Sequence, residues 1–311
     1  MAISVNTNVP SLIAQNSLNK ALSAMEKAME QLTTGKRING AGDDAAGLVI
    51  SENMRMQING SNKAMENVQD AQNFAAVAEG GMITIGDHLQ RINELLIQGA
   101  NDTNSVESRQ AILVEVKQRL EDINVIAQST QFNGRTMLDG TFGDAGAAFI
   151  VQIGPYSDSG ATTNPGAPDN PLNTLDISRA FADCHLSTLG VGTTIGAGYD
   201  GIILPDELDP DNPAFDPTGD NFRAYMDTVQ AAITEVTEAR GLLGGYLNRM
   251  TATYDNLTIT VENMTTAKSR ITDTDVAEAS SEMIKQQILE QVTGSMLTQA
   301  NQLPQLALSL I

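Results

Sequence analysis

The residue types that most often carry catalysis or bind metal ions are few and scattered in this sequence. Its two histidines, His88 and His185, lie far apart in the chain, and no His-Glu-x-x-His pattern is present. Its one cysteine, Cys184, stands beside His185, but no third residue nearby would orient the imidazole, so the pair is more typical of a structural position than of an activated thiol. We therefore predict no catalytic residue, no metal ligand, no cofactor and no enzyme activity.

Carboxylates cluster in one Pro-rich segment, where they could bind calcium or simply face solvent. A helix-loop-helix calcium site requires an Asp-x-Asp-x-Asp-Gly frame and a glutamate at its twelfth position, and the segment lacks both. The acidic residues concerned are Asp206, Glu207, Asp209, Asp211, Asp216 and Asp220. A solvated acidic exterior is the simpler interpretation, and calcium binding is the alternative.

A glycine-rich segment from Gly42 to Gly47 is the remaining candidate for ligand chemistry. It has no lysine, and Asp43 and Asp44 stand where a phosphate group would lie. We therefore expect a bend in which small residues allow close packing, rather than a phosphate site.

Composition argues against several other classes of function. The 311-residue chain has a net charge of −20, 4% aromatic residues and no tryptophan. So acidic a chain is expected to bind neither nucleic acid nor an anionic membrane surface. No apolar run reaches the roughly 18 residues that a membrane-spanning helix needs. Residues 1–20 lack the basic and apolar regions of a cleaved secretory signal, so the residues alone predict a cytosolic protein.

The longest regular pattern is an alternation of three and four residues between the apolar positions from Phe222 to Ile271. Such a repeat keeps one stripe of a helix against partner helices in left-handed packing. Similar stripes predict two earlier helices, the first of which starts at Ala45 or later. We expect helices at about 60–99, 105–129 and 222–267 to pack against one another within the chain. The predicted seam comprises Leu89, Ile92, Leu96, Leu113, Val116, Leu120, Val229, Val236, Leu243 and Leu257.

Amphipathic stripes also mark both ends of the chain. One covers Ser11 to Thr34, and the other begins near Val276, with Pro304 ending or kinking it. The first turns of the N-terminal helix are rich in Asn, Ser, Thr and Gln, which compete for backbone hydrogen bonds, so we expect this helix to order only on assembly. The predicted subunit interface comprises Leu18, Leu22, Met25, Met29, Leu32, Ile284, Ile288, Val292 and Met296.

The central region differs from both ends in composition. Residues 141–221 hold eight of the ten prolines, twelve acids and one base. Phe149–Gly154 and Leu175–Ile177 are strand candidates that would pair, and Asn133-Gly134 predicts a hairpin turn. The predicted fold is therefore mainly α: a long antiparallel helical coiled-coil bundle formed by the N- and C-terminal segments, with a central region rich in β-hairpins and loops.

Several exact motifs at both ends resemble those of one protein family. The N-terminal motifs are Asn6-Thr7-Asn8, Gln15 to Lys20, Leu32 to Asn39, Asp43 to Gly47, Leu89 to Leu95 and Thr130 to Gly134. The C-terminal motifs are Asn248-Arg249, Ala267 to Ile271 with Asp273 and Asp275, and Gln299 to Gln302 with Pro304. Together they span about two-thirds of the chain in the right order. The sequence closely resembles bacterial flagellins, the subunits of the flagellar filament.

The resemblance implies a structural protein that polymerises with identical subunits outside the cell. It implies export through the flagellar type III apparatus with an export chaperone and without a cleaved signal, which replaces the cytosolic expectation. Hook-junction and cap proteins would be its other partners. An inner domain is expected at residues 1–55 with 268–311 and a rod-like domain at 56–267. The stretch 141–221 is too short for a full outer domain.

The resemblance also implies a site for a host innate-immune receptor at Arg91, Leu95 and Glu115. Two neighbouring positions depart from the pattern of receptor-activating members, with Asn93 where many have Arg and Met250 where Phe often follows Asn-Arg.

Three other functions remain as alternatives. A hook–filament junction protein shares the terminal motifs but is present in few copies. An enzyme carried on a flagellin scaffold would need a catalytic constellation in residues 141–221, and none is evident. A soluble coiled-coil adaptor would form a dimer that does not polymerise.

Overall fold

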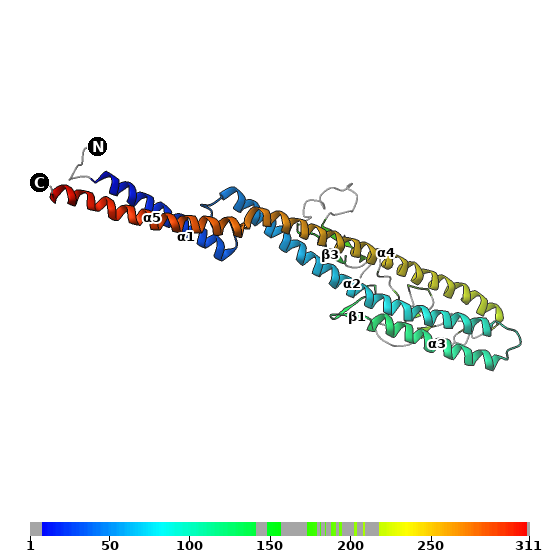
Figure 1. The fold of residues 1–311 in the computed structure, drawn as a ribbon. Coiled ribbons are helices and arrows are strands. Elements are labelled where there is room, and N and C mark those ends of the chain that lie inside the picture. The colour runs from blue at the N-terminus through cyan, green and yellow to red at the C-terminus, as the bar shows by residue number, and fades with distance from the viewer. Residues whose placement is uncertain are drawn as a thin grey trace, which may run out of the picture. The chain divides into compact units, whose positions relative to one another are not determined.

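The computed structural model describes residues 8–140, 148–156, 173–178, 181, 184, 188–190, 193–194, 202–203, 208 and 218–309. These residues form the helices α1 (Val9–Thr34), α2 (Ala45–Gly99), α3 (Val106–Ser129), α4 (Gly219–Thr272) and α5 (Val276–Ser309), with short strands between α3 and α4 (Figure 1). The mainly helical fold with a small central β-region confirms the predicted fold class.

The chain divides into two compact units. The first unit comprises Met1–Ile58 and Thr260–Ile311, and the second comprises Asn59–Ile259. The domain boundaries expected from the sequence, near residues 55 and 268, stay a prediction. The absence of a full outer domain also stays a prediction, because it concerns a segment of which the structure describes only parts.

In the second unit, α2, α3 and α4 bury one continuous cluster of aliphatic side chains. All ten predicted seam residues are buried, from Leu89, Ile92, Leu96, Leu113, Val116, Leu120, Val229 and Leu243 at 0% exposure to Val236 at 2% and Leu257 at 8%. Polar contacts show that α4 runs antiparallel to α2. Gln72 Nε2 donates to Thr251 Oγ1 at 3.2 Å, and Thr258 Oγ1 donates to Met65 Sδ at 3.4 Å.

Two glycines of α2 allow other elements to approach this helix closely. A Cβ atom on Gly81 would lie only 2.8 Å from Leu138 Cδ1 and from Thr130 Oγ1, and one on Gly99 would overlap the ring of Phe222. Adjacent Gly80 has no neighbour within 4 Å of its Cβ position. Close packing therefore accounts for Gly81 but not for Gly80.

The described strands form three antiparallel pairs in the second unit. They are β1 (Gln131–Phe132) with β2 (Arg135–Thr136), β3 (Ile150–Gln152) with β4 (Thr174–Asp176), and β5 (Thr193–Thr194) with β6 (Ile202–Ile203). Asn133 and Gly134 join the first pair with φ angles of 51° and 75°, as a type I′ turn requires. Both the turn and the β3–β4 pairing were predicted from the sequence and are confirmed.

An aromatic cluster packs this β-region against α2. The ring of Phe74, on α2, stacks on Phe149 with centroids 4.4 Å apart and meets Phe132 and Phe181 edge-on at 5.6 and 5.2 Å. Because ring pairs in these geometries contribute about 0.5–1.5 kcal/mol beyond area burial, the cluster anchors the short strands that could not persist alone.

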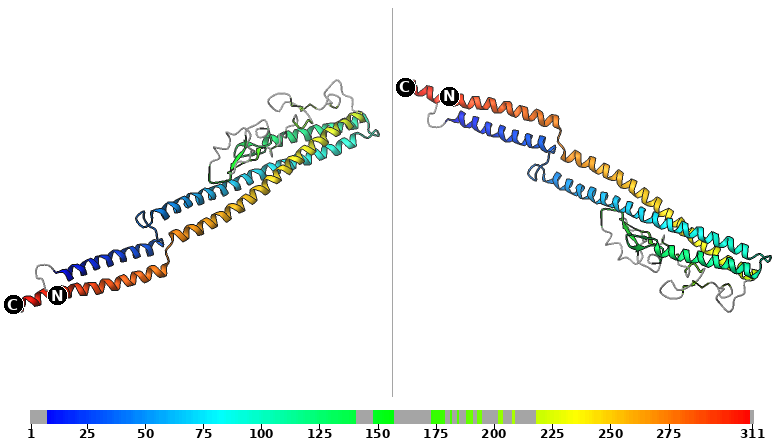
Figure 2. Two further views of the ribbon diagram at one scale, coloured as in Figure 1. Left: turned by 90° about the horizontal axis from the view of Figure 1, so that it is seen from above. Right: turned by 90° about the horizontal axis from the view of Figure 1, so that it is seen from below.

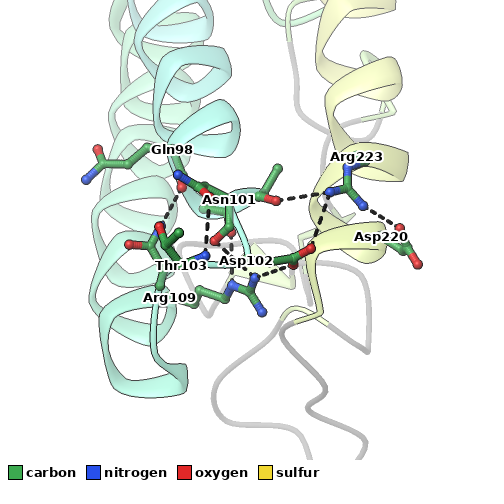
Figure 3. Close-up of polar contacts among 10 residues, drawn as sticks. Gln98, Asn101, Asp102, Thr103, Arg109, Asp220 and Arg223 are labelled. Atoms are coloured by element: carbon green, nitrogen blue, oxygen red, sulfur yellow. Dashed lines mark hydrogen bonds and ion pairs between the residues drawn. The ribbon is translucent and has the colours of Figure 1, made fainter.

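Two arginines hold the connection that follows α2 (Figure 3). Arg109, on α3 and only 9% exposed, donates to the carbonyl oxygens of Gly99 at 3.0 Å and Asn101 at 3.1 Å, and pairs with Asp102 at 2.9 Å. Arg223, on α4, donates to Ala100 O at 3.3 Å. Since α2 has no basic residue in its last turn, these guanidinium groups supply the positive charge that a helix C-terminus favours.

In the first unit, α1 and α5 lie side by side (Figure 2). Asn8 Nδ2 donates to Ala300 O at 2.8 Å, and Ser11 Oγ donates to Asn301 Oδ1 at 2.8 Å. α5 continues to Ser309, so Pro304 does not end it.

The other end of the α1–α5 pair is closed by a short backbone pairing between two connections. Arg37 N donates to Thr272 O at 2.7 Å, Thr274 N donates to Gly35 O at 3.0 Å, and Arg37 Nη2 donates to Ile271 O at 2.8 Å. The break between α4 and α5, which the sequence indicated at Thr272 to Asp275, is therefore an ordered joint rather than a loose linker.

The glycine-rich bend before α2 is built around two aspartates. The carboxylate of Asp43 accepts hydrogen bonds from the backbone N–H groups of Asn39 and Gly40 and pairs with Lys27 Nζ at 2.7 Å. Asp44 Oδ1 accepts from Gly47 N at 2.9 Å, which caps the start of α2. The acids thus occupy the backbone N–H groups that a phosphate site would use.

Candidate functional site

The α1–α5 pair of the first unit packs through small side chains. The buried residues of α1 are Ala14, Ala21 and Ala28, spaced by seven residues, and those of α5 up to residue 302, where the description of its side chains ends, are Ala279 and Ala300. Alanine at this spacing lets two helices approach closely along a coiled-coil seam, but it buries little apolar area. The larger apolar residues of both helices must therefore lie elsewhere.

Most of the large apolar side chains on α1 and α5 are uncovered. Of the predicted interface residues, Leu18, Leu22, Met25 and Leu32 are half-buried, whereas Met29 is 47%, Ile284 52%, Ile288 55%, Val292 47% and Met296 60% exposed. Val9, Leu12, Ile13 and Leu289 are exposed as well. We name this set of exposed residues on α1 and α5 the terminal apolar surface.

Four members of the terminal apolar surface, namely Val9, Leu12, Ile13 and Leu289, were not predicted from the sequence. Val9, Leu12 and Ile13 share one face at helical spacing, but they fall before or just inside the predicted helix start at Ser11. The structure begins α1 at Val9, with Asn8 as its N-cap and Pro10 in the first turn. Of the polar residues at this end, Asn8 is the N-cap and Ser11 donates to it, so the helix can extend to include this apolar group.

The ends of the two helices also lack charge. Residues 1–19 and 291–311 contain no Asp, Glu, Lys, Arg or His. Burying a charged group without a partner costs several kcal/mol, whereas covering an aliphatic side chain contributes about 1.5–3 kcal/mol. The terminal apolar surface can therefore be covered without desolvating any side-chain charge in these segments.

Most of the net negative charge lies in the second unit instead. Residues 59–259 contain 27 of the 38 acids and 10 of the 18 bases, a net charge of −17, whereas the first unit carries 11 acids and 8 bases, a net charge of −3. The two units thus differ in what they can present to another molecule: one offers apolar area, the other a negative field.

The residues of the expected receptor site lie in the second unit. Arg91 Nη1 pairs with Glu94 Oε2 at 2.9 Å, and Arg91 Nη2 pairs with Glu115 Oε1 at 3.4 Å, so the exposed Arg91 and the half-buried Glu115 are adjacent across α2 and α3. Leu95 is 3% exposed and belongs to the core.

Among the residues that the structure describes, the candidates for site chemistry lie apart from one another. Cys184 is buried, and its N–H donates to Leu138 O at 3.0 Å, while His185 lies outside the described residues. His88 Nδ1 lies 3.8 Å from Asp122 Oδ2. Asp220 pairs with Arg223, and the other five candidate calcium ligands, Asp206, Glu207, Asp209, Asp211 and Asp216, lie outside the described residues.

In the part of the chain that the structure describes, no group of three His, Cys, Asp or Glu side chains could hold a metal ion. No described helix combines the length and apolar character needed to cross a membrane.

Fold and surface together define a helical structural protein with an uncovered apolar face on its paired terminal helices. The family model for the bacterial flagellin N-terminal helical region matches residues 5–143, and the model for the bacterial flagellin C-terminal helical region matches residues 226–311. The flagellin of Bacillus subtilis (strain 168) is 37% identical over 313 residues and covers 99% of each chain. The flagellar filament 33 kDa core protein of Treponema phagedenis is 36% identical over 307 residues, again covering 99% of each chain. The chain belongs to the bacterial flagellin family.

A solved structure agrees with this fold. A flagellar hook-associated protein from Vibrio parahaemolyticus superposes with a TM-score of 0.54 at 14% sequence identity, covering 74% of this chain and 100% of the other. At this identity the likeness concerns the fold alone.

Proposed function

We propose that this chain is a subunit of the bacterial flagellar filament and that it polymerises by covering the terminal apolar surface with further copies of itself. The observation that carries the proposal is the uncovered set of large aliphatic residues on α1 and α5, of which Leu12 and Ile13 are each 61% exposed. Exposed apolar faces of this extent mark interaction sites. A second copy fits because every subunit carries the same two helices, whose terminal segments within residues 1–19 and 291–311 have no charged side chain.

The mechanism is the addition of many modest contacts rather than chemistry at one site. Each large aliphatic side chain that becomes covered contributes about 1.5–3 kcal/mol before ordering costs. Several such residues on each of two helices can offset the entropy lost when a subunit joins a polymer. No catalytic group is needed, which supports a structural rather than an enzymatic role.

Family membership supports a wider set of partners. The subunit would leave the cell through the flagellar type III export apparatus with an export chaperone, without a cleaved signal peptide. In the filament it would adjoin the hook-junction and cap proteins. Neither nucleic acid nor a membrane is a proposed partner, in keeping with the net charge of −20.

A host innate-immune receptor is a further proposed partner. The exposed Arg91 with the adjacent Glu115 would be the groups that a receptor contacts. Since Leu95 is 3% exposed, its role would be to support α2 from within the core.

The assembly proposal is tested on the full chain by comparing two pairs of substitutions on α5. Ile288→Ser with Val292→Ser removes exposed apolar groups, and we expect polymer formation, measured by sedimentation and electron microscopy, to fall at least tenfold. Gln287→Ser with Gln291→Ser, at neighbouring exposed positions, is the matched control and should polymerise normally. Equal polymerisation by both variants would contradict the proposal.

Deletion of Val276 to Ile311 is the larger change. We expect it to abolish filaments while circular dichroism still reports the helices of the second unit. The length of the polymers formed by the unmodified chain separates the alternatives, because a hook–filament junction protein would not form long filaments and a coiled-coil adaptor would stop at a dimer.

A further inference from the structure

The methionines of the chain differ in exposure between the two units. Among the described residues, the strongly exposed methionines are Met29 at 47%, Met56 at 60% and Met296 at 60%, and all three belong to the first unit. In the second unit, Met82, Met137 and Met250 are fully buried and Met65 and Met226 are half-buried. Exposed thioethers are therefore concentrated in the unit that carries the terminal apolar surface.

Two of these methionines lie within the terminal apolar surface itself. Met29 is on α1 and Met296 is on α5, and Met56 lies on the part of α2 that belongs to the first unit, where Val49 and Ile50 are also exposed. Methionine is flexible and polarizable, which suits a surface that must fit a neighbouring copy. It is also the apolar side chain that a mild oxidant can make polar.

The chemistry is a two-electron oxidation by a hydroperoxide. The thioether sulfur attacks one peroxide oxygen, the O–O bond breaks, a sulfur–oxygen bond forms, and the remaining oxygen leaves as water or as an alcohol after taking up a proton. The product, methionine sulfoxide, is polar and accepts hydrogen bonds. The one thiol of the chain, Cys184, is 0% exposed and so is shielded from the same reagent.

We propose that Met29, Met56 and Met296 form an oxidation-sensitive site at which hydroperoxides block polymerisation of the free subunit. The inference rests on the proposed assembly function, because the sulfoxides act by making the terminal apolar surface and its neighbour on α2 polar. Once a methionine is covered by another copy, its sulfur is shielded. The free subunit is therefore the sensitive form, and the filament is the protected one.

We expect a large effect on polymerisation, although oxidation adds only three oxygen atoms to each subunit. Covering a methionine side chain in place of leaving it in water favours the polymer by a factor of roughly ten to a hundred, and a sulfoxide forfeits that gain. We expect the subunit concentration needed for polymerisation to rise at least tenfold after oxidation. The second unit should keep its stability, because its methionines are buried or half-buried.

The test treats the full-length unpolymerised subunit with dilute hydrogen peroxide and follows two quantities. Peptide mass spectrometry should find sulfoxide first at Met29, Met56 and Met296, and much less of it when the reagent is added to filaments. Sedimentation of the treated subunits should then show the rise in the concentration needed for polymerisation. Circular dichroism during thermal unfolding should show an unchanged second unit.

Three variants test whether oxidation of these three methionines, rather than of others, causes the loss of polymerisation. The variant with Met29→Leu, Met56→Leu and Met296→Leu is compared with itself before and after peroxide treatment, and the concentration that it needs for polymerisation should not change on treatment. The same three positions changed to Gln should impair polymerisation without any oxidant. Met65→Leu with Met226→Leu, at the half-buried methionines of the second unit, is the matched control and should remain sensitive to peroxide.

Contrary outcomes are distinguishable. If untreated subunits polymerise and oxidised subunits polymerise equally well, the inference is wrong while the assembly function stands. The same holds if the triple leucine variant loses competence as fast as the unmodified chain. If untreated subunits do not polymerise at all, the assembly function fails and the inference fails with it.

Discussion

The two units place their large aliphatic residues in opposite positions, one in the core and the other on the surface. In the second unit, the seam holds large aliphatic residues such as Leu89, Leu96 and Leu243, each at 0% exposure, and the charge lies outside. In the first unit, the α1–α5 seam holds alanines, and large aliphatic residues such as Ile288 face outward at 55% exposure. The second unit thus encloses a core of large aliphatic residues, whereas the paired helices of the first leave most of theirs on the surface.

Truncating one large aliphatic residue in each unit should give the largest difference in stability between the units. Leu96→Ala leaves a cavity in a closed core and should lower the free energy of unfolding by about 2–5 kcal/mol. Ile288→Ala removes a solvated side chain and should change it by less than about 0.5 kcal/mol. Urea unfolding of the unpolymerised variants measures both. Similar losses for the two would show that the units do not differ in this way.

A pair of glycines tests how tightly the second unit is closed. In Gly99→Ala the new methyl group meets the Phe222 ring, and we expect a loss of about 1–3 kcal/mol of stability from overpacking. Gly80→Ala, on the same helix with nothing within 4 Å, should instead stabilise the chain by up to about 1 kcal/mol through helix propensity. Thermal unfolding of both variants is the measurement. A stabilised Gly99→Ala variant would mean that this contact is loose.

Acid should act on the first unit through two aspartates. The hydrogen bond from Lys27, followed by those from the backbone of Asn39 and Gly40, lowers the pKa of Asp43 below its ordinary value of 3.8. The hydrogen bond from Ser269 does the same for the pKa of Asp273. Because each folded-state pKa is depressed, their stabilising contribution is present above pH 3.8 and is lost as the pH falls below it.

The pH effect is the smallest of the three, since both carboxylates are exposed. Amide-exchange protection of residues 35–44 and 271–275, corrected for the intrinsic exchange rate, should fall as the pH drops below 3.8. The variants Asp43→Asn and Asp273→Asn should show weak protection at every pH in the same segments. Protection that stays constant in the unmodified chain through this range would argue against a role for these two carboxylates.

The sequence was sufficient for the seam of the second unit because its period is read directly from residue type. The alternation from Phe222 to Ile271 predicted which residues of α4 face the core, and the Asn133-Gly134 dipeptide predicted a turn with two positive φ angles. These features depend on local geometry and on large differences in hydrophobicity. They need no knowledge of distant parts of the chain.

Other features could not be predicted because they depend on which residues meet in space. The alanine seam of α1 carries little signal, since alanine is compatible with both a core and a surface. Nothing in the sequence marks Arg109, because its three acceptors lie at the end of α2 and in the connection that follows it, and only the fold brings them within reach. Gly81 and Gly80 are indistinguishable in sequence, and only the positions of Leu138 and Thr130 in the fold separate them.

The spacing of Ala14, Ala21 and Ala28 has a consequence for how α1 and α5 are aligned. A seam of identical small residues repeating every seven positions matches itself when one helix slides by a heptad, so it selects no single register. Alignment must come from groups that do not repeat. The hydrogen bond from Asn8 to Ala300 at one end and that from Arg37 to Thr272 at the other are such groups. The contacts at the two ends of the seam therefore fix the register that the alanines between them do not specify.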